Sequence, residues 1–186
     1  MKHPYFFGYG SLVNRRTHTY DDAHRAKIVG WRRIWRHVAT RKVAFLTAYP
    51  CPGHTLDGLI AQVPQGDWDA LDEREFSYLR EPTDEVQHAL DGAPQVQIYH
   101  APPDLHAPAT QKHPVVLSYL DAVVQGYLRE FGEDGVQRFF DTTDGWDAPI
   151  RDDRSDPIYS RHQSLSRDER AVVDREIARV GAEMSA

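Results

Sequence analysis

The first half of the chain alternates short apolar segments with turn-forming residues. These segments are rich in aromatic and β-branched side chains and have the length of strands: residues 5–9, 27–38, 43–49, 56–63 and 95–100. Prolines and glycines separate them, as in the Pro-Cys-Pro-Gly run at residues 50–53. The pattern therefore predicts several β-strands. One helical segment interrupts them, because from Asp67, a residue suited to an N-cap, side chains recur at helical spacing as far as Tyr78.

The second half changes to a helical period. Pro114 is suited to a first helical turn, and the apolar residues after it follow a 3.6-residue stripe that stops at Gly132. A second, short helix is expected over residues 133–140. Ser166 and Glu169 have the spacing of a capping box, which predicts a third helix.

Residues 141–159 are acidic and contain two prolines, which indicates an irregular connection between these helices. We therefore predict an α+β fold, with an antiparallel or mixed sheet first and helices packed on it. The length of 186 residues suits one domain over residues 1–186, with a helical C-terminal extension from about residue 114.

Composition narrows the function classes. With 40% hydrophobic and 27% charged residues, the chain is typical of a globular protein. Its net charge of −6 disfavours a nucleic acid as the main partner, and no apolar run approaches the roughly 20 residues that span a bilayer. Cys51 is the single cysteine, and the start Met-Lys-His-Pro lacks the apolar core of a signal peptide. We expect a cytoplasmic protein that does not bind membranes.

The first candidate site is the segment Phe-Phe-Gly-Tyr-Gly-Ser-Leu at residues 6–12. Its glycines let backbone N–H groups approach a ligand closely, and such a nest binds a carboxylate, a phosphate or an oxyanion. A plain turn after a strand is the alternative. Two specific motifs fail at Val13, where both the dinucleotide-binding fingerprint and the serine-hydrolase elbow require glycine.

The second candidate site is the segment Leu-Asp-Glu-Arg-Glu-Phe-Ser-Tyr at residues 71–78. A carboxylate among its apolar side chains would have a raised pKa and would act as a general acid or base near neutrality. The alternative is a solvated helix face on which Arg74 pairs with a neighbour.

Together these segments resemble the γ-glutamylcyclotransferase-like superfamily. The resemblance rests on Tyr-Gly-Ser-Leu at residues 9–12, followed some sixty residues later by Leu-Asp-Glu-Arg-Glu at 71–75 and then Tyr78. Further matches are Gly-Trp-Arg at 30–32, Leu-Asp-Gly-Leu at 56–59, Ser-Tyr-Leu at 118–120 and Gly-Tyr at 126–127. The similarity spans roughly residues 5 to 130.

This resemblance implies a small mixed β-barrel flanked by helices. It also implies an enzyme that cyclises a small γ-glutamyl amine or peptide to 5-oxoproline and releases the amine, with neither metal nor cofactor. Glu75 matches the general acid/base of the family. The residues that match its substrate-binding positions are Tyr9, Gly10, Ser11, Leu12 and Tyr78.

Other interpretations remain open. The same cavity would also suit a non-catalytic module that binds a small molecule. Residues 31–37 interleave aromatic and cationic side chains and would suit RNA, although Arg–Trp pairs stacked on a sheet explain the pattern better. Three histidines near prolines (His100, His106, His113) lack zinc-site spacing, and three aspartates (Asp152, Asp153, Asp156) lack the glutamate of a calcium loop. The sequence does not specify the oligomeric state.

Overall fold

The computed structural model describes residues 4–38 and 41–185. Of the N-terminal residues on which the signal-peptide expectation rests, Pro4 alone lies within these ranges. The strands and helices are β1 (Tyr5–Gly8), β2 (His24–Arg36), β3 (Phe45–Gln62), α1 (Asp69–Arg74), β4 (Leu79–Thr83), β5 (Val86–His88), β6 (Val96–His100), β7 (Val115–Val116), α2 (Leu117–Asp141), β8 (Thr143–Asp144), β9 (Ile150–Arg151), α3 (Arg167–Arg179) and β10 (Met184–Ser185).

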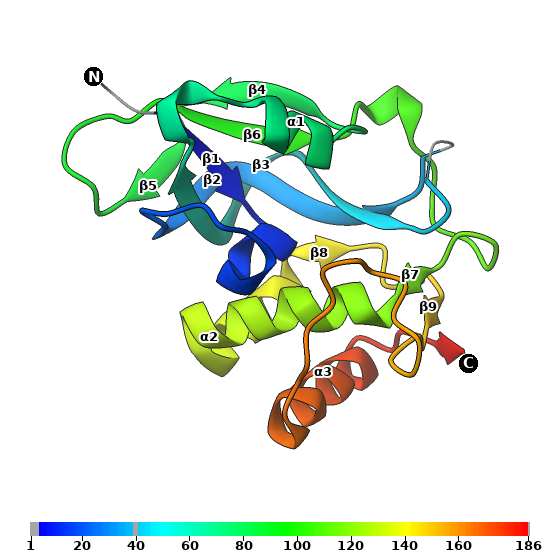
Figure 1. Cartoon of the computed structure of the whole chain (residues 1–186). Coiled ribbons are helices and arrows are strands. Elements are labelled where there is room, and N and C mark those ends of the chain that lie inside the picture. The colour runs from blue at the N-terminus through cyan, green and yellow to red at the C-terminus, as the bar shows by residue number, and fades with distance from the viewer. Residues whose placement is uncertain (1–3, 39–40, 186) are drawn as a thin grey trace.

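A curled, mixed sheet forms the upper layer in Figure 1. Within the described ranges it has seven strands in the order β4-β6-β1-β3-β2-β5, with β8 added beside β2. The short strand β1 is central, because it pairs antiparallel with β3 and parallel with β6. Its side chains are buried, which explains why three of its four residues are aromatic. The predicted α+β class and small mixed barrel flanked by helices are confirmed.

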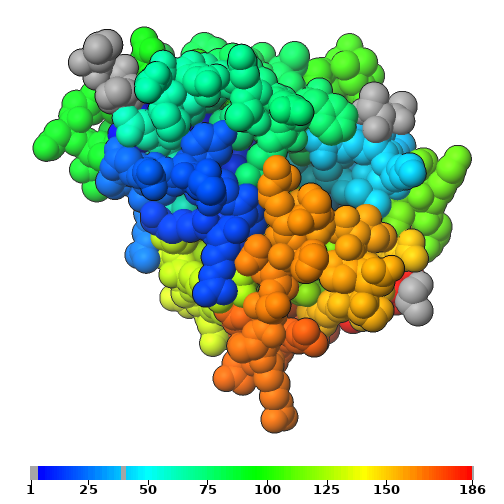
Figure 2. Space-filling view, viewed as in Figure 1, coloured from blue at the N-terminus to red at the C-terminus, as the bar shows by residue number. Residues whose placement is uncertain are grey.

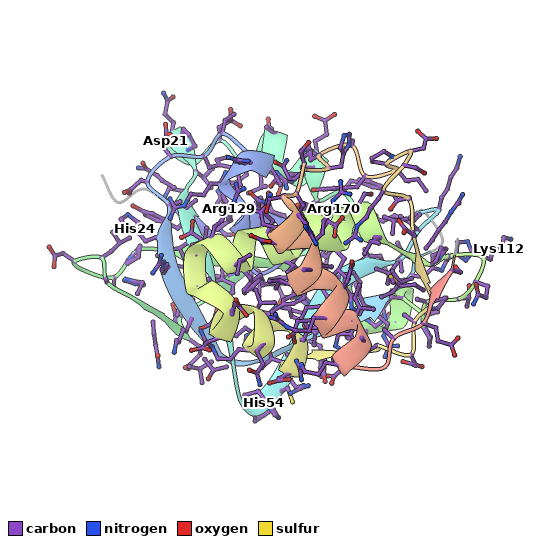
Figure 3. All side chains as sticks on the ribbon, turned by 90° about the horizontal axis from the view of Figure 1, so that it is seen from below. Asp21, His24, His54, Lys112, Arg129 and Arg170 are labelled. Carbon is purple, nitrogen blue, oxygen red and sulfur yellow. The ribbon has the colours of Figure 1, made fainter. Side chains whose placement is uncertain are left out.

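Helices lie on both sides of this sheet. In Figure 1, α1 lies beside β4 and β6, whereas α2 lies on the opposite side and α3 lies beyond α2. Figure 3 shows α3 crossing α2 from below, near Arg129, which forms an ion pair with Glu169. The predicted apolar stripe of α2 is core, since Leu120, Val123 and Tyr127 are fully buried.

The two strands predicted at 43–49 and 56–63 are one strand, β3, so that prediction is corrected. Trp31 of β2 pairs with Pro50, and Val29 pairs with Thr55. One residue of β2, Gly30, is therefore opposite four residues of β3. The Pro-Cys-Pro-Gly run is an excursion within a continuous strand rather than a hairpin turn.

The first predicted helix is shorter than expected. It begins at Asp69 with Trp68 as N-cap, although Asp67 still accepts a hydrogen bond from the Asp69 backbone N–H. It ends before Glu75, whose backbone leaves helical geometry, and Tyr78 follows in a turn closed by its N–H donating to the Glu75 carbonyl. The short helix thus places Glu75 at its C-terminal end.

The later helices follow the prediction with local corrections. Helix α2 begins at Leu117 rather than at Pro114, because Val115–Val116 pair with β9. Gly132 has φ 69° and breaks α2 into two helical segments, as the stop and restart predicted. Ser166 and Glu169 form the predicted capping box of α3. The connection over 141–159 is irregular apart from the short strands β8 and β9.

The aromatic and cationic strand 31–37 is not an exposed stacking surface. Arg33 is fully buried and Trp35 is 1% exposed. The Arg33 guanidinium packs over the rings of Tyr127 and Phe139 at 5.1 and 4.9 Å from their centroids. The Arg–Trp stacking expected on the sheet is therefore wrong for Arg33, and its burial removes it from contact with RNA.

No helix in the described part of the chain is long and apolar enough to cross a membrane.

Candidate functional site

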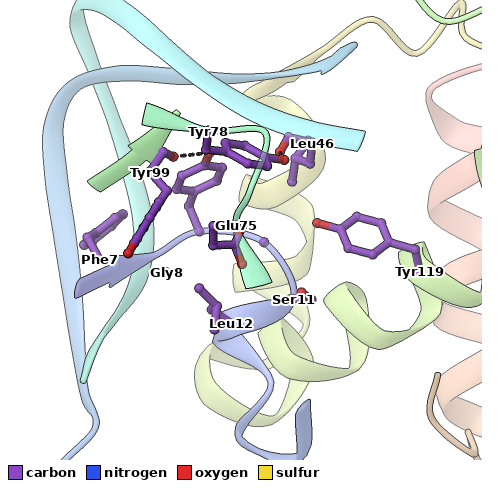
Figure 4. Close-up of a pocket in the computed structure, with 11 residues that line it drawn as sticks. Phe7, Gly8, Ser11, Leu12, Leu46, Glu75, Tyr78, Tyr99 and Tyr119 are labelled. Atoms are coloured by element: carbon purple, nitrogen blue, oxygen red, sulfur yellow. Dashed lines mark hydrogen bonds between the residues drawn. The ribbon is translucent and has the colours of Figure 1, made fainter. Parts of the chain in front are cut away.

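The two sequence motifs line one small hollow. Figure 4 shows the Glu75 side chain between Tyr99 and Tyr119, with Ser11 and Leu12 below it in this view. The hollow has a volume of about 30 Å³. Since one water needs roughly 10–15 Å³, it has room for a carboxylate or an amide group rather than for a large ligand. Its lining residues are Phe7, Gly8, Tyr9, Gly10, Ser11, Leu12, Leu46, Glu75, Tyr78, Tyr99 and Tyr119.

The Glu75 carboxyl is sheltered from water. Its side chain is 17% exposed, and its Oε1 lies 3.3 Å from Nε of Arg74. Burial raises the pKa of Glu75, and the charges of Arg74, Arg41 and Arg161 offset this effect only in part. A raised pKa is the property predicted for a carboxyl of this segment, and it makes Glu75 a stronger base than an exposed glutamate.

Arg74 links the two motifs. Besides Glu75, it approaches the Ser11 hydroxyl at 3.3 Å and donates to the Thr17 carbonyl at 2.9 Å. Thr17 in turn donates its hydroxyl to the Ser11 carbonyl at 2.7 Å. The charged helix end and the glycine-containing loop are therefore one hydrogen-bonded unit.

Buried tyrosines form the walls of the hollow. The Tyr9 hydroxyl donates to the Tyr99 carbonyl at 2.6 Å and accepts the Ala48 N–H at 3.2 Å. The Tyr78 hydroxyl donates to the Leu46 carbonyl at 2.7 Å. Burial raises the pKa of both phenols far above neutrality, and the Glu75 charge adds to this effect. Both side chains thus stay neutral and fix the position of the walls.

Tyr119 is a site residue that the sequence predictions did not select. Its hydroxyl reaches the glycine loop, because a side chain on Gly10 would place Cβ 2.8 Å from this oxygen. Burial raises the pKa of Tyr119. The match of Ser-Tyr-Leu at 118–120 was the signal available in the sequence, but its contact with a loop more than a hundred residues earlier required the fold.

Two long-range contacts hold the glycine loop in place. Arg33 donates from Nε to the Tyr9 carbonyl at 3.0 Å, and the Tyr127 hydroxyl is 2.9 Å from the same oxygen. On the other side, α2 approaches the loop so closely that a Cβ on Gly126 would lie 2.7 Å from the backbone nitrogen of Asn14. The loop conformation therefore depends on β2 and α2 as well as on its own glycines.

Solved structures of other proteins resemble the fold of this chain over most of its length. An uncharacterized protein from Homo sapiens superposes with a TM-score of 0.56 at 12% identity, covering 94% of this chain and 99% of that one. A γ-glutamyl cyclotransferase superposes with a TM-score of 0.54 at 13% identity, covering 92% and 98%. The chain has the γ-glutamyl cyclotransferase fold. The protein YkqA from Bacillus subtilis shares it with a TM-score of 0.58 at 16% identity, over 74% of this chain and 53% of YkqA.

No protein-family model matches the chain, and no curated protein is significantly similar to it in sequence. At 12–16% identity the structural comparisons establish the fold and leave the reaction open.

In this cyclotransferase-like fold, a wider cleft, called the outer cleft below, adjoins the hollow. It has a volume of about 290 Å³ and shares four residues with the hollow: Ser11, Glu75, Tyr78 and Tyr119. Its far wall is the 158–161 segment that precedes α3. Figure 2 shows this segment, in orange, reaching the teal surface that contains α1. Glu75 therefore lies where the small hollow meets a cleft of ligand size.

The alternative metal sites receive no support from the geometry. Among the described residues, no group of three or more histidine, cysteine, aspartate or glutamate side chains is placed to hold a metal ion. Asp153, one of the three aspartates considered for calcium, is buried and accepts hydrogen bonds from the backbone N–H and hydroxyl of Ser118. Its role is to tie the 153–158 segment to the start of α2.

Proposed function

We propose that this protein is a γ-glutamyl cyclotransferase, which converts a γ-glutamyl amine or peptide into 5-oxoproline and a free amine. The observation that carries the proposal is the sheltered carboxyl of Glu75, with its raised pKa, in the same hollow as the glycine loop 9–12. The fold shared with a γ-glutamyl cyclotransferase supports it.

The reaction is an intramolecular acyl transfer. The α-amine nitrogen of the substrate attacks its own γ-carbonyl carbon, a ring C–N bond forms, and the original amide C–N bond breaks. Holding the substrate in the folded-back conformer brings the two atoms together and removes much of the entropic barrier. The reaction is redox-neutral and needs no cofactor.

Glu75 is assigned the proton transfers. The α-amine is mostly protonated at neutral pH, so its proton must leave before attack, and the Glu75 carboxylate accepts it. The resulting carboxylic acid then protonates the departing nitrogen. The attacking nitrogen still carries one proton too many, and the regenerated Glu75 carboxylate passes this second proton to the released amine, which completes the balance. The raised pKa suits both steps because the group must hold and release a proton in turn.

The loop amides are assigned to an anionic group of the substrate. The turn at residues 11–13 is closed by the Val13 N–H donating to the Gly10 carbonyl, so the amides of Ser11 and Leu12 precede its first hydrogen bond. They would bind either the oxyanion of the tetrahedral intermediate or the α-carboxylate of the substrate. The volume of the hollow suits a group of this size.

The test is an assay for 5-oxoproline. The pure protein is incubated with a γ-glutamyl dipeptide, a γ-glutamyl alkylamine and glutathione, and the product is quantified by mass spectrometry. Release from at least one substrate is expected, and Glu75→Gln should lower kcat/KM by about 10²–10⁴. Glu73→Gln, a matched change at an exposed position two residues earlier, should leave it unchanged.

Two outcomes would contradict the proposal. Saturable binding without 5-oxoproline release would identify a binding module with the same cavity. Unchanged turnover in Glu75→Gln, with release intact in the wild type, would remove Glu75 from its assigned role.

A further inference from the structure

The outer cleft has a charge opposite to that of the whole chain. Its charged lining residues are three arginines, at positions 41, 74 and 161, and one acid, Glu75. The local balance is therefore positive in a protein whose net charge is −6. A cleft lined by one sign of charge attracts ligands of the opposite sign.

Arg74 is already occupied, whereas the other two arginines are available. Arg74 pairs with Glu75 and bonds to Thr17. Within the described ranges, neither Arg41 nor Arg161 forms an ion pair with a carboxylate. Because ionised arginines favour carboxylate partners, two guanidinium groups are left for a ligand.

Arg41 is held in position before any ligand arrives. Its guanidinium packs over the rings of Phe76 and Tyr78, at 4.7 and 5.4 Å from their centroids. Its Nε also donates to the Ser77 hydroxyl at 3.2 Å. Stacking and one hydrogen bond fix the plane of the guanidinium and reduce the entropy that a ligand would otherwise have to overcome.

Arg161 comes from a different part of the chain. It lies on the exposed segment that forms the far wall of the cleft, after Tyr159, whose ring contacts Tyr119 edge-to-face at 5.0 Å. Arg41 precedes β3, so the two cations approach the cleft from separate elements. Because both line the same cleft, a ligand with two anionic groups would meet one cation from each element.

The position of the cleft identifies which part of the substrate lies there. Glu75 lines both the inner hollow and the outer cleft, which places the scissile amide near the residues shared by both spaces. The departing amine then extends into the outer cleft. We propose that the preferred leaving group is an acidic amino acid, whose two carboxylates are bound by Arg41 and Arg161. This inference rests on the proposed cyclotransferase activity and specifies its substrate.

The test compares two nearly isosteric substrates that differ by one charge, γ-glutamyl-glutamate and γ-glutamyl-glutamine. At low ionic strength, kcat/KM should be about tenfold higher for the acidic substrate, a typical gain for one hydrogen-bonded charge. Salt should reduce the ratio, because this cleft is open to solvent. Arg161→Gln should bring the ratio toward one, while Arg167→Gln, an exposed arginine outside the cleft, should leave it unchanged.

A binding measurement separates failure of this inference from failure of the proposed function. Calorimetry on Glu75→Gln should give a dissociation constant about tenfold lower for γ-glutamyl-glutamate than for γ-glutamyl-glutamine. If neither dipeptide releases 5-oxoproline but this preference is present, the activity is wrong and the anionic subsite stands. Equal kcat/KM values, equal affinities, or no binding of either dipeptide would overturn the subsite.

Discussion

Arg74 lies beside the carboxyl of Glu75, its immediate neighbour in the sequence, and binds Ser11 and Thr17 at the same time. The Nε–Oε1 distance to Glu75 is 3.3 Å. The attraction favours the carboxylate, but the cost of removing a charge from water is larger, and the net effect is a raised pKa. The same contact therefore positions Glu75 without fixing its proton.

The raised pKa of Glu75 predicts a loss of stability with rising pH. The folded protein holds this proton at pH values where the unfolded chain, with a pKa of about 4.5, has lost it. The free energy of unfolding thus falls as pH rises from 4.5 through the folded pKa. Glutamine does not titrate, so Glu75→Gln removes this dependence. In urea unfolding, the free energy of unfolding of Glu75→Gln relative to wild type should therefore rise as pH increases from 4 to 7. A constant difference across that range would contradict the raised pKa.

The lowered pKa of His18 predicts the opposite effect, a loss of stability as pH falls. Burial and the nearby charge of Arg74 lower the pKa of His18 from 6.5 to about 4, while its ring contacts the Leu12 carbonyl. As pH falls from 6.5 to about 4, the unfolded chain gains a proton that the folded protein does not. Unfolding should become easier by about 2–3 kcal/mol, the lower figure allowing for partial exposure.

The control for His18 is the non-titrating variant His18→Gln. Urea unfolding at pH 7 and pH 5 should show a smaller acid-dependent loss in this variant than in wild type. Identical losses in both proteins would place the acid sensitivity elsewhere.

The close approach of α2 to the glycine loop predicts a cost for Gly126→Ala. The added Cβ would lie 2.7 Å from the backbone of Asn14, which cannot rotate away as a side chain would. We expect a loss of about 1–3 kcal/mol, as for overpacking, together with a higher KM because the loop must shift. Gln137→Ala, an exposed position of the same helix, should leave both quantities nearly unchanged in thermal unfolding and kinetics.

The hydrogen bonds of Asp153 predict that its substitution changes substrate binding, although Asp153 does not line the hollow. Its carboxylate accepts the backbone N–H groups of Ser118 and Ile158 at 2.7 and 2.8 Å. Asparagine presents an NH₂ group to one of these donors, so Asp153→Asn should cost about 1–3 kcal/mol. Displacement of the 158–161 segment should raise KM more than it lowers kcat. Asp152→Asn, at an exposed neighbour, is the control, and an equal effect of both variants would exclude the proposed tether.

Local sequence was sufficient for the parts of the site that depend on neighbouring residues. The glycines of residues 8–10 marked the loop, and the acidic and apolar side chains of residues 71–78 predicted a carboxyl with a raised pKa. The family resemblance then identified Glu75 as that carboxyl. The capping box at Ser166 was predictable for the same reason, since both partners lie within four residues.

Contacts between distant segments were not predictable from local pattern. Arg33 is charged and lies two residues from a tryptophan on either side, so the strand pattern predicted Arg–Trp stacking on one face of the sheet. Its burial requires the Tyr9 carbonyl and the Tyr127 hydroxyl, both far away in sequence. The outer cleft is a similar case, because Arg41 and Arg161 have no sequence spacing that links them.

The division of the site between two parts of the chain has an evolutionary consequence. The hollow is built by residues 7–119, whereas the opposing wall of the cleft comes from a short segment at 158–161. Under the proposed function, exchanging that segment would change which departing amine is accepted and would leave Glu75 and the glycine loop in place. Related chains would then diverge fastest there while retaining a common chemistry.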